Sequence, residues 1–444
     1  MLELAYTIRG LLGTDEVLIS VRIILAISPI QEYPSLKSIY YQNQAAGNLT
    51  GYQDAVTQRR DNLLAIKTGL LISPFKRGFR TNNHFEIFYL PVLKINQLEE
   101  QITKLSSEIE KKMLSLPPVA RDQVFISNLI DELQSTNEIE NVRSSREELG
   151  TVIDRIKQNK SDKGRFSGLA NQYIKFQDNK YNKIHDVQDF RTIWDELVSQ
   201  EIKSDDLPDG KQFRKEGEII RSGDRVVHRG DESEEQIISD LGKLVNEMND
   251  DDIPSLPKCF IAHYFYEYVH PFYDGNGRTG RFIVCSYLSR KLDMMSAITF
   301  SSAILKNKDT YYKAFVEMAN PYNAGEATFF IISMMQLLLS GQQQVIEKLD
   351  DDIDLLKKAN NLTDDAQLEQ SAENVLFILC QATIFRKYVK SLTDKSLSEY
   401  TGLSRFRLNK VLDSLIQSGY IELMQANPKT HKLTLKTQQV LFSN

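Results

Sequence analysis

HPFYDGNGRTGRF, residues 270–282, is the stretch of this 444-residue chain that carries most information about its fold. Three glycines, Gly275, Gly277 and Gly280, fall within six residues and permit tight turns and close approach of a ligand to the backbone. The stretch leads into a helix that we expect to begin near Arg278. Exposed N–H groups at a helix start, beside a glycine-rich turn, predict an anion-binding site.

The charged side chains of the same stretch supply further parts of a phosphate site. Arg278 and Arg281 offer charge-assisted, forked contacts to phosphate. Asp274 is a hard oxygen ligand suited to Mg²⁺. His270, at the end of the preceding helix, is suited to act as a general base. Together these groups predict phosphoryl or nucleotidyl transfer. The alternative is a glycine-rich turn with a structural histidine.

Residues 270–281 resemble the Fic family, whose motif HPF-x-(D/N)-GNGR-x-x-R they match at every specified position. The resemblance implies an ATP-binding loop. A hydroxyl of a protein target would attack the α-phosphate, so that AMP is transferred and pyrophosphate leaves. His270 would deprotonate the hydroxyl, and Asp274 would hold Mg²⁺ between the α- and β-phosphates.

The resemblance also implies roles for the rest of the loop. Asn276 and the backbone from Gly275 to Gly277 would line the α-phosphate, Arg278 would contact the β-phosphate side, and Arg281 the γ-phosphate. Gly280 completes the nucleotide-binding set within the motif. Pro271 and Phe272 would be structural, with Phe272 buried beneath the loop. The Gly277-Arg278 pair, in place of the lysine of phosphotransferase relatives, favours AMP transfer.

Two positions outside the loop have competing interpretations. His263, one heptad before His270 on the same helix face, resembles a family position, but core packing is the alternative. Tyr311, in KDTYYKAF, resembles an aromatic residue near the adenine, but adjacent tyrosines also serve packing. Nothing in the loop excludes nucleotide donors other than ATP.

The stretch TNEIENVRSS, residues 136–145, resembles the inhibitory pattern (S/T)-x-x-x-E-(G/N) of the family through Thr136, Glu140 and Asn141. The resemblance implies that the Glu140 carboxylate occupies the guanidinium of Arg281 in place of the γ-phosphate. ATP would then bind with its α-phosphate misaligned for attack. In some relatives this glutamate also orients a water that removes AMP from the target, so AMP removal is a second activity open to Glu140.

A β-hairpin is predicted within residues 213–230, because EII and RVV flank the turn-forming Ser222-Gly223-Asp224. It resembles the family's flap. Such a strand can pair with an extended target segment through backbone hydrogen bonds, and we assign this docking role to Glu218, Ile219, Ile220 and Arg221. An ordinary surface hairpin is the alternative.

Composition is typical of a globular protein, with 41% hydrophobic and 26% charged residues and a net charge of −6. Three cysteines argue against a disulfide framework and favour a reducing cytoplasm. The first residues show no signal-peptide pattern. The longest apolar run, at 327–341, is interrupted by Gln336 and is predicted to be a buried helix, so we expect no membrane partner.

The fold is predicted to be mainly α, with five regions. A mixed N-terminal region (1–95) contains β-like runs at 17–30 and 84–93, with no assigned role. Helices with the inhibitory motif (96–160), including an amphipathic helix at 97–116, precede a helical Fic core with its hairpin flap (161–345). An acidic linker (346–372) leads to a winged helix-turn-helix (373–444). The oligomeric state stays open, a homodimer being one alternative.

The last 71 residues carry ten Lys and Arg against four Asp and Glu. Short strands are predicted at YIEL and KLTLK, with the turn MQANPKTH between them. Arg405, Arg407 and Lys410 would lie on or near a recognition helix, where they could neutralise DNA phosphates. Winged helices also bind proteins. The sequence therefore predicts an autoinhibited adenylyltransferase, and a DNA-binding regulator with a nucleotide-sensing Fic domain is the alternative.

Overall fold

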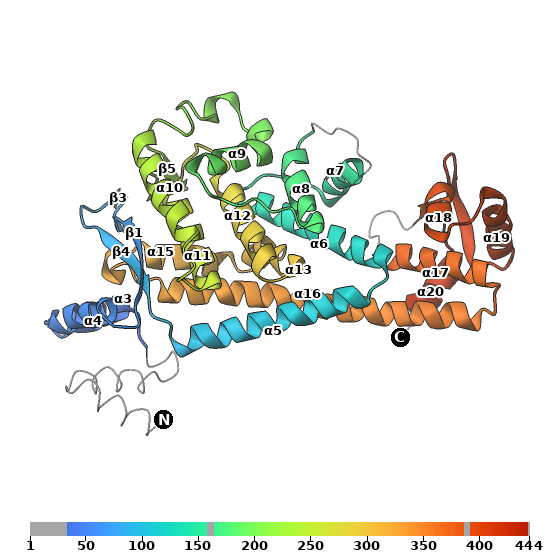
Figure 1. Ribbon diagram of the computed structural model, residues 1–444, viewed down its shortest axis with the longest axis horizontal. Coiled ribbons are helices and arrows are strands. Elements are labelled where there is room, and N and C mark those ends of the chain that lie inside the picture. Colours follow the sequence, from blue (N-terminus) through green and yellow to red (C-terminus); the bar gives the residue numbers. More distant parts are fainter. Residues whose placement is uncertain (1–32, 158–163, 386–390, 443–444) are drawn as a thin grey trace, which may run out of the picture.

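The computed structural model describes residues 33–157, 164–385 and 391–442, and helices form most of it (Figure 1). The mainly α-helical architecture predicted from the sequence is confirmed. Within the described ranges, the strands form three two-stranded ladders and one three-stranded sheet. The β-like run predicted at 17–30 lies outside the described residues.

Two exposed helices and four short strands make up the described N-terminal region. They are α3 (Leu36–Ala45), α4 (Thr50–Arg60), β1 (Ile66–Ile72), β2 (Phe75–Lys76), β3 (Phe79–Arg80) and β4 (Phe85–Tyr89). The predicted run at 84–93 contains β4, which pairs antiparallel with β1. α3 and α4 each bury a single residue, so no apolar periodicity marks them in the sequence and neither is predicted there.

The two longest helices, α5 (Leu93–Ser115) and α16 (Thr328–Asp365), lie side by side along the molecule (Figure 1). α5 buries residues at helical spacing, among them Leu98 and Ile102, as its amphipathic pattern predicts. Among the described helices, only α16 is long and apolar enough to cross a membrane. Its apolar half, with Ile331 and Leu338, is buried in the protein core, as expected for a core helix.

The central part of the fold surrounds a buried helix, α11 (Ser255–Val269), against which α10, α12 and α16 pack. The other elements between α5 and α16 are α6 (Pro118–Ile139), α7 (Arg146–Lys157), α8 (Ser167–Ile174), η2 (Lys175–Asp178), α9 (Val187–Leu197), η3 (Ser199–Glu201), η4 (Ser204–Asp206), β5 (Ile219–Ser222), β6 (Arg225–Arg229), α10 (Glu234–Met248), α12 (Asn276–Lys291), α13 (Met294–Ala297), α14 (Phe300–Lys306), α15 (Lys308–Met318) and η5 (Pro321–Asn323). β5 and β6 form the predicted hairpin, with Gly223 in the left-handed conformation at its turn.

The C-terminal module consists of α17, two further helices, a three-stranded sheet in the order β7-β9-β8, and a last helix. Its elements are α17 (Gln370–Phe385), β7 (Leu392–Thr393), α18 (Asp394–Thr401), α19 (Arg405–Gln417), β8 (Ile421–Ala426), β9 (Lys429–Leu433) and α20 (Leu435–Phe442). The predicted turn MQANPKTH is much shorter in the structure, because β8 and β9 extend to Ala426 and Lys429 on either side of Asn427 and Pro428. KLTLK is therefore only partly strand, and its end begins α20.

The acidic, helix-prone region interpreted as a linker (346–372) is helical over most of its length. Its larger part, up to Asp365, continues α16 without a break. Leu349 and Leu356 from this segment pack in the large core, whereas Ala359 packs in the core of the C-terminal module. α17 also contacts both parts, since Phe385 joins the large core and α17 packs against α6. The two cores are joined by packed helices.

Glu326 is a fully buried carboxylate that ties the N-terminal helices to the core. It accepts hydrogen bonds from Arg59 (2.8 Å) and from the Tyr33 hydroxyl (2.7 Å). Arg59→Ala leaves this carboxylate without its ion pair and should lower the free energy of unfolding by about 3–5 kcal/mol. Arg60→Ala removes an exposed guanidinium paired with Asp61 and should change it by less than about 1 kcal/mol. Denaturant unfolding measures both variants, and equal losses would contradict this assignment.

Candidate active site

The candidate site is the loop between α11 and α12. The loop begins at His270, which ends α11 in the left-handed conformation (φ 54°), and it enters α12 through Gly275 (φ 86°). A Cβ atom on Gly275 would lie 2.8 Å from the indole Nε1 of Trp194, so only glycine fits there. The first intrahelical bond of α12 is donated by Thr279, which leaves the N–H groups of the preceding turn without a partner inside the helix.

Two side chains hold the loop in shape. Asn276 accepts a hydrogen bond from the Phe272 N–H (3.0 Å) and donates to the Phe272 carbonyl (2.6 Å). Trp194 stacks on the Phe272 ring at 4.7 Å and donates to the Asp274 carbonyl (2.9 Å). Phe272 is fully buried beneath the loop. The Asn276 amide is thus used within the loop, so its side chain is not placed to line a phosphate; only its backbone N–H can.

His270 is enclosed by groups from four elements. Its Nδ1 lies 3.9 Å from a carboxylate oxygen of Glu267 on α11, and its ring is 6.4 Å from that of His228 on β6. Burial and the positive charges of Arg214 and Arg80 lower the pKa of His270 to about 3, opposed by a hydrogen bond to the Glu267 backbone. The imidazole is therefore neutral at pH 7 and able to accept a proton.

Asp274 and Arg278 lie at the mouth of the loop. The Asp274 side chain is half exposed, and its Oδ1 accepts from the Gly275 N–H (2.5 Å) and lies 3.8 Å from Arg278. Arg278 is buried and donates to Glu201 (3.0 Å). Among the described residues, no cluster of three or more His, Cys, Asp or Glu could hold a metal ion. A single exposed carboxylate suits Mg²⁺ that also coordinates phosphate oxygens, so Asp274 fits a metal that arrives with a nucleotide.

Arg281 is a buried charge that is held by residues at the end of α6. Its Nε donates to the Thr136 hydroxyl (2.9 Å). Its Nη2 donates to the Thr136 carbonyl (3.1 Å) and lies 2.8 Å from the Glu140 carboxylate. Thr136 and Glu140 lie one helical turn apart on α6, which explains their spacing in the sequence. Asn141 follows with φ 58°, a conformation that asparagine and glycine tolerate at the end of a helix.

The Glu140 carboxylate also lies over the first turn of α12. A Cβ atom on Gly277 would be 2.0 Å from Glu140 Oε1, and one on Gly280 would be 2.3 Å from Glu267 Oε1. Both glycines therefore make room for carboxylates in the present arrangement. A negative charge is stabilised at this end of a helix. Burial opposes the charge of Arg281, but Glu140, Tyr311 and Glu267 outweigh it and raise the pKa of Arg281.

Glu140 and Glu267 both lie near Arg281, but only Glu140 forms an ion pair with it. Burial raises the pKa of Glu267 to about 8, Arg281 opposes that shift, and Glu140 adds to it. Glu267 is therefore largely protonated at pH 7, whereas Glu140 at the exposed end of α6 forms the ion pair. The sequence analysis did not single out Glu267, because a lone carboxyl on an otherwise apolar helix carries no motif.

Tyr311 requires a correction. Its ring is buried and its hydroxyl lies 2.8 Å from His263 Nε2, so it is not open to an adenine. Tyr312, the adjacent tyrosine, is 48% exposed. Burial raises the pKa of Tyr312, and the charge of Glu140 adds to that shift. The sequence alone does not decide which of the two tyrosines faces outward.

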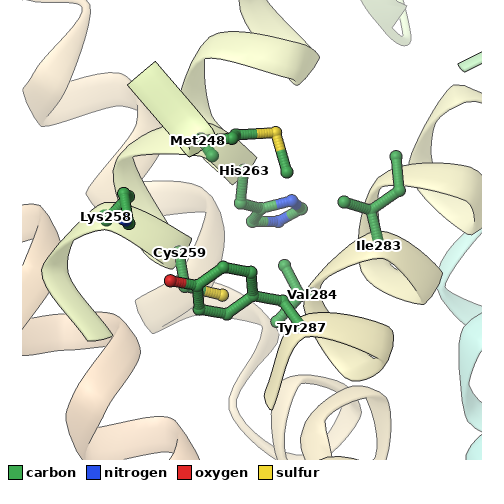
Figure 2. A pocket seen from close by; sticks show the side chains of 8 residues that line it. Met248, Lys258, Cys259, His263, Ile283, Val284 and Tyr287 are labelled. Carbon is green, nitrogen blue, oxygen red and sulfur yellow. The ribbon is translucent and has the colours of Figure 1, made fainter. Parts of the chain in front are cut away.

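His263 packs in the core between α11 and α12, where Figure 2 shows its ring near Met248, Ile283 and Val284. The cavity that these side chains line measures about 10 Å³, which is room for about one water and not for a nucleotide. The core-packing interpretation of His263 is the one that fits this placement.

The predicted docking residues lie in and before β5. Ile219 and Ile220 are half buried, Arg221 is exposed, and the Glu218 carbonyl accepts from the Gly230 N–H (3.0 Å). Phe213 and Arg214 precede the hairpin and are fully buried.

Arg214 is a site residue to which the sequence assigned no role. Its guanidinium donates to the carbonyls of His270 (2.8 Å), Val269 (3.2 Å) and Asp231 (2.5 Å). The segment that leads into the β5–β6 hairpin is thereby fixed to the loop that begins at His270. The only signal in the sequence is that an arginine stands beside Phe213 at the start of the hairpin.

The proposed DNA-contacting residues lie together on one element, far along the chain from the loop. Arg405, Arg407 and Lys410 are all exposed on α19. The exposed Phe406 lies between them, with Lys410 Nζ 4.8 Å above its ring.

Comparison with known proteins gives one domain match. Residues 182–288 match the model of the Fic/DOC family, within the region 161–345 that we assigned to the Fic core. A Fic family protein from Desulfovibrio desulfuricans is 18% identical, with a TM-score of 0.48 over 81% of this chain and 99% of its own. Fic-1 from C. elegans is 16% identical (TM-score 0.38; 58% and 74% of the chains). A Fic domain containing signaling protein from Bacteroides thetaiotaomicron is 17% identical (TM-score 0.39; 58% and 96%).

Asn276→Ala tests the bracing of the loop. The substitution leaves two buried backbone groups of Phe272 without partners, and each costs about 1–3 kcal/mol. We expect a lower melting temperature than that of the parent. Asn409→Ala, at an exposed position on α19, should leave it unchanged. Equal melting temperatures of all three proteins would show that the loop does not depend on this side chain.

Proposed function

We propose, from the premise that residues 182–288 form a Fic/DOC family domain, that this chain is an autoinhibited protein adenylyltransferase. The family's members transfer nucleotides or other phosphate-linked groups to proteins. The observation that carries the finer proposal is the ion pair between Glu140 and Arg281. The Glu140 carboxylate also lies over Gly277, in the motif that begins at His270. A carboxylate is bound where the motif requires a phosphate.

The transfer step uses His270 as the general base. A Ser, Thr or Tyr hydroxyl of the target gives its proton to the neutral imidazole while its oxygen bonds to the α-phosphorus of ATP. The bond from that phosphorus to the bridging oxygen breaks, and pyrophosphate leaves with the electron pair. Burial and the nearby arginines lower the pKa of His270, so the imidazole is neutral at pH 7 and has a free nitrogen for the proton. The charges of ATP would raise that pKa toward neutrality and make the base stronger.

The substrate's phosphates would be held by backbone and cations. The N–H groups at Asn276 and Gly277 and the guanidinium of Arg281 would bind and orient the nucleotide. Arg278 would turn from the Glu201 carboxylate to the β-phosphate side, because its guanidinium can bind either of these anions. Asp274 would hold Mg²⁺, which neutralises phosphate charge when bound.

Autoinhibition follows from competition for one guanidinium. Arg281 is buried and held from behind by Thr136, so it cannot serve the Glu140 carboxylate and a γ-phosphate together. ATP bound with its γ-phosphate displaced would present the α-phosphorus out of line. A misplacement of about 1 Å can cost on the order of 100-fold in rate.

The surroundings of the site support a protein substrate in the cytoplasm. β5 is a strand of a two-stranded hairpin beside His270, suited to pair with an extended target segment. The three cysteines are free and buried, in keeping with a reducing compartment.

AMP removal by Glu140 from a modified target is also part of this proposal. It is tested by AMP release from the purified, modified target.

Glu140→Gly should raise AMP transfer by roughly 100-fold, because Arg281 is then open to the γ-phosphate. The measurement is incorporation of labelled AMP from ATP into a cell extract and into the protein itself. Glu138→Gly is the matched control, since Glu138 is exposed in the last turn of α6, two residues before Glu140. It should behave like the parent.

His270→Ala in the Glu140→Gly protein should abolish this transfer, since no base then takes the proton. Equal incorporation by Glu140→Gly and the parent would refute the autoinhibition. Transfer that survives His270→Ala would refute the assigned base. UTP and CTP, tested beside ATP, identify the nucleotide donor.

A second candidate is a DNA-binding regulator, favoured by the exposed cations of α19. Arg405, Arg407 and Lys410 stand free of the module's core, and contacts to phosphates would make binding fall with salt. A mobility shift with short duplexes over a salt series measures this. Replacing the three residues by alanine should weaken binding and flatten its salt dependence. Retention of both would assign the module to protein partners.

A further inference from the structure

We infer that Arg80, in the β2–β3 hairpin outside the matched domain, is a positioning residue that holds the end of α11 and thereby His270. This inference rests on the proposed function in that His270 is the base whose placement matters. It gives the N-terminal region a role in the active site.

The Arg80 guanidinium donates hydrogen bonds to two backbone carbonyls and to one carboxylate. Its Nε donates to the Arg229 carbonyl at the end of β6 (2.9 Å), and its two terminal nitrogens donate to Asp231 (2.7 Å) and to the Tyr268 carbonyl (2.8 Å). Its guanidinium also lies 4.0 Å above the Tyr268 ring. The Asp231 side chain is fully buried. One side chain thus joins the hairpin, the flap and α11.

The contacts of Arg80 are at the place where α11 most needs partners. The last carbonyls of a helix have no acceptor role within it and favour a nearby cation. In α11 these carbonyls belong to Tyr268, bound by Arg80 and His228, and to Val269, bound by Arg214 and the Asp231 N–H. His270 is the next residue, so its direction depends on how this end is held.

The hairpin that carries Arg80 is itself fixed from several directions. The Phe75 N–H donates to the Ala319 carbonyl (2.8 Å), and the Ser73 N–H donates to the Tyr268 hydroxyl (2.9 Å). Arg229 donates to the Gly78 carbonyl (2.8 Å), which reciprocates the bond from Arg80 to the Arg229 carbonyl. A hairpin held this way can act as a rigid support for Arg80.

Arg80 also belongs to the charges that surround His270. The groups facing the imidazole are Arg80 from β3, Arg214 from the start of the flap, Glu267 from α11 and His228 from β6. Both arginines disfavour the imidazolium. Removal of Arg80 should therefore raise the pKa of His270 and move the acid limb of the pH–rate profile to higher pH. A purely structural support would not produce that shift.

The test compares variants in the Glu140→Gly protein, with labelled AMP transfer as the readout. Arg80→Met should lower kcat roughly tenfold or more, because His270 is no longer aligned, and should leave KM for ATP within about twofold, because the nucleotide contacts remain. Arg80→Lys should recover part of kcat. Arg77→Met, at the exposed turn of the same hairpin, should leave both constants unchanged.

Arg80→Met leaves Asp231 buried and uncompensated, which endangers folding. Arg80→Met/Asp231→Asn removes that charge and keeps the shape. It should melt near the parent's temperature, with kcat still reduced. A folded double variant with the kcat of the Glu140→Gly protein would overturn the inference.

The position of the His270 ring separates this inference from the proposed function. If the Glu140→Gly protein and its Arg77→Met variant transfer no AMP, the proposed function fails. The inference is then decided by the position of the His270 ring in crystal structures: a displaced ring in the Arg80→Met/Asp231→Asn variant supports it, and an unchanged ring position overturns it.

Discussion

The buried guanidinium of Arg281 is the constraint on which the rest of the site depends. It stands in the first two turns of α12, where the helix dipole already favours negative charge, and Thr136 fixes it from α6 through two hydrogen bonds. A charge buried this deeply requires an anionic partner. Glu140 supplies one from within the chain, so the unliganded arrangement is satisfied and a nucleotide must compete for it.

That competition is set by how firmly α6 is held. Glu132 lies one turn before Thr136 and two before Glu140, on the same face of α6. It is fully buried and accepts hydrogen bonds from the Ser301 N–H (2.8 Å) and the Ser301 hydroxyl (2.5 Å) on α14. Burial raises the pKa of Glu132 to about 7. α6 also packs against α17 of the C-terminal module. The helix that ends in Glu140 is therefore supported by the core on one side and by the C-terminal module on the other.

How far the sequence predicts this site depends on the kind of interaction. The loop at 270–281 and the pair Thr136 and Glu140 are predictable because fixed spacings place phosphate-binding groups on one helix start and two contacts on one helix face. Asn276 and Tyr311 could not be assigned from spacing, since each side chain is turned by its own partner, Phe272 in one case and His263 in the other. Arg80 lies 190 residues before His270 in the chain, and only tertiary packing brings them together.

In the fold, too, regular spacing is visible in the sequence and individual side-chain contacts are not. Helices that bury an apolar stripe, such as α5, are visible in the sequence, and those held by polar and aromatic contacts, such as α3 and α4, are not. The acidic stretch after residue 345 has the composition of a linker, but its few apolar residues, Leu349 and Leu356, lie at helical spacing and continue α16 into both cores. In this stretch the spacing of the apolar residues predicts the packed helix better than the acidic composition does.

The most direct measurement is a crystal structure of the parent and of the Glu140→Gly protein, each with a non-hydrolysable ATP analogue and Mg²⁺. The account predicts that the γ-phosphate contacts the Arg281 guanidinium in the variant, whereas in the parent Glu140 keeps that contact and the γ-phosphate lies elsewhere. A γ-phosphate bound to Arg281 in the parent, with the Glu140 bridge intact, would contradict it.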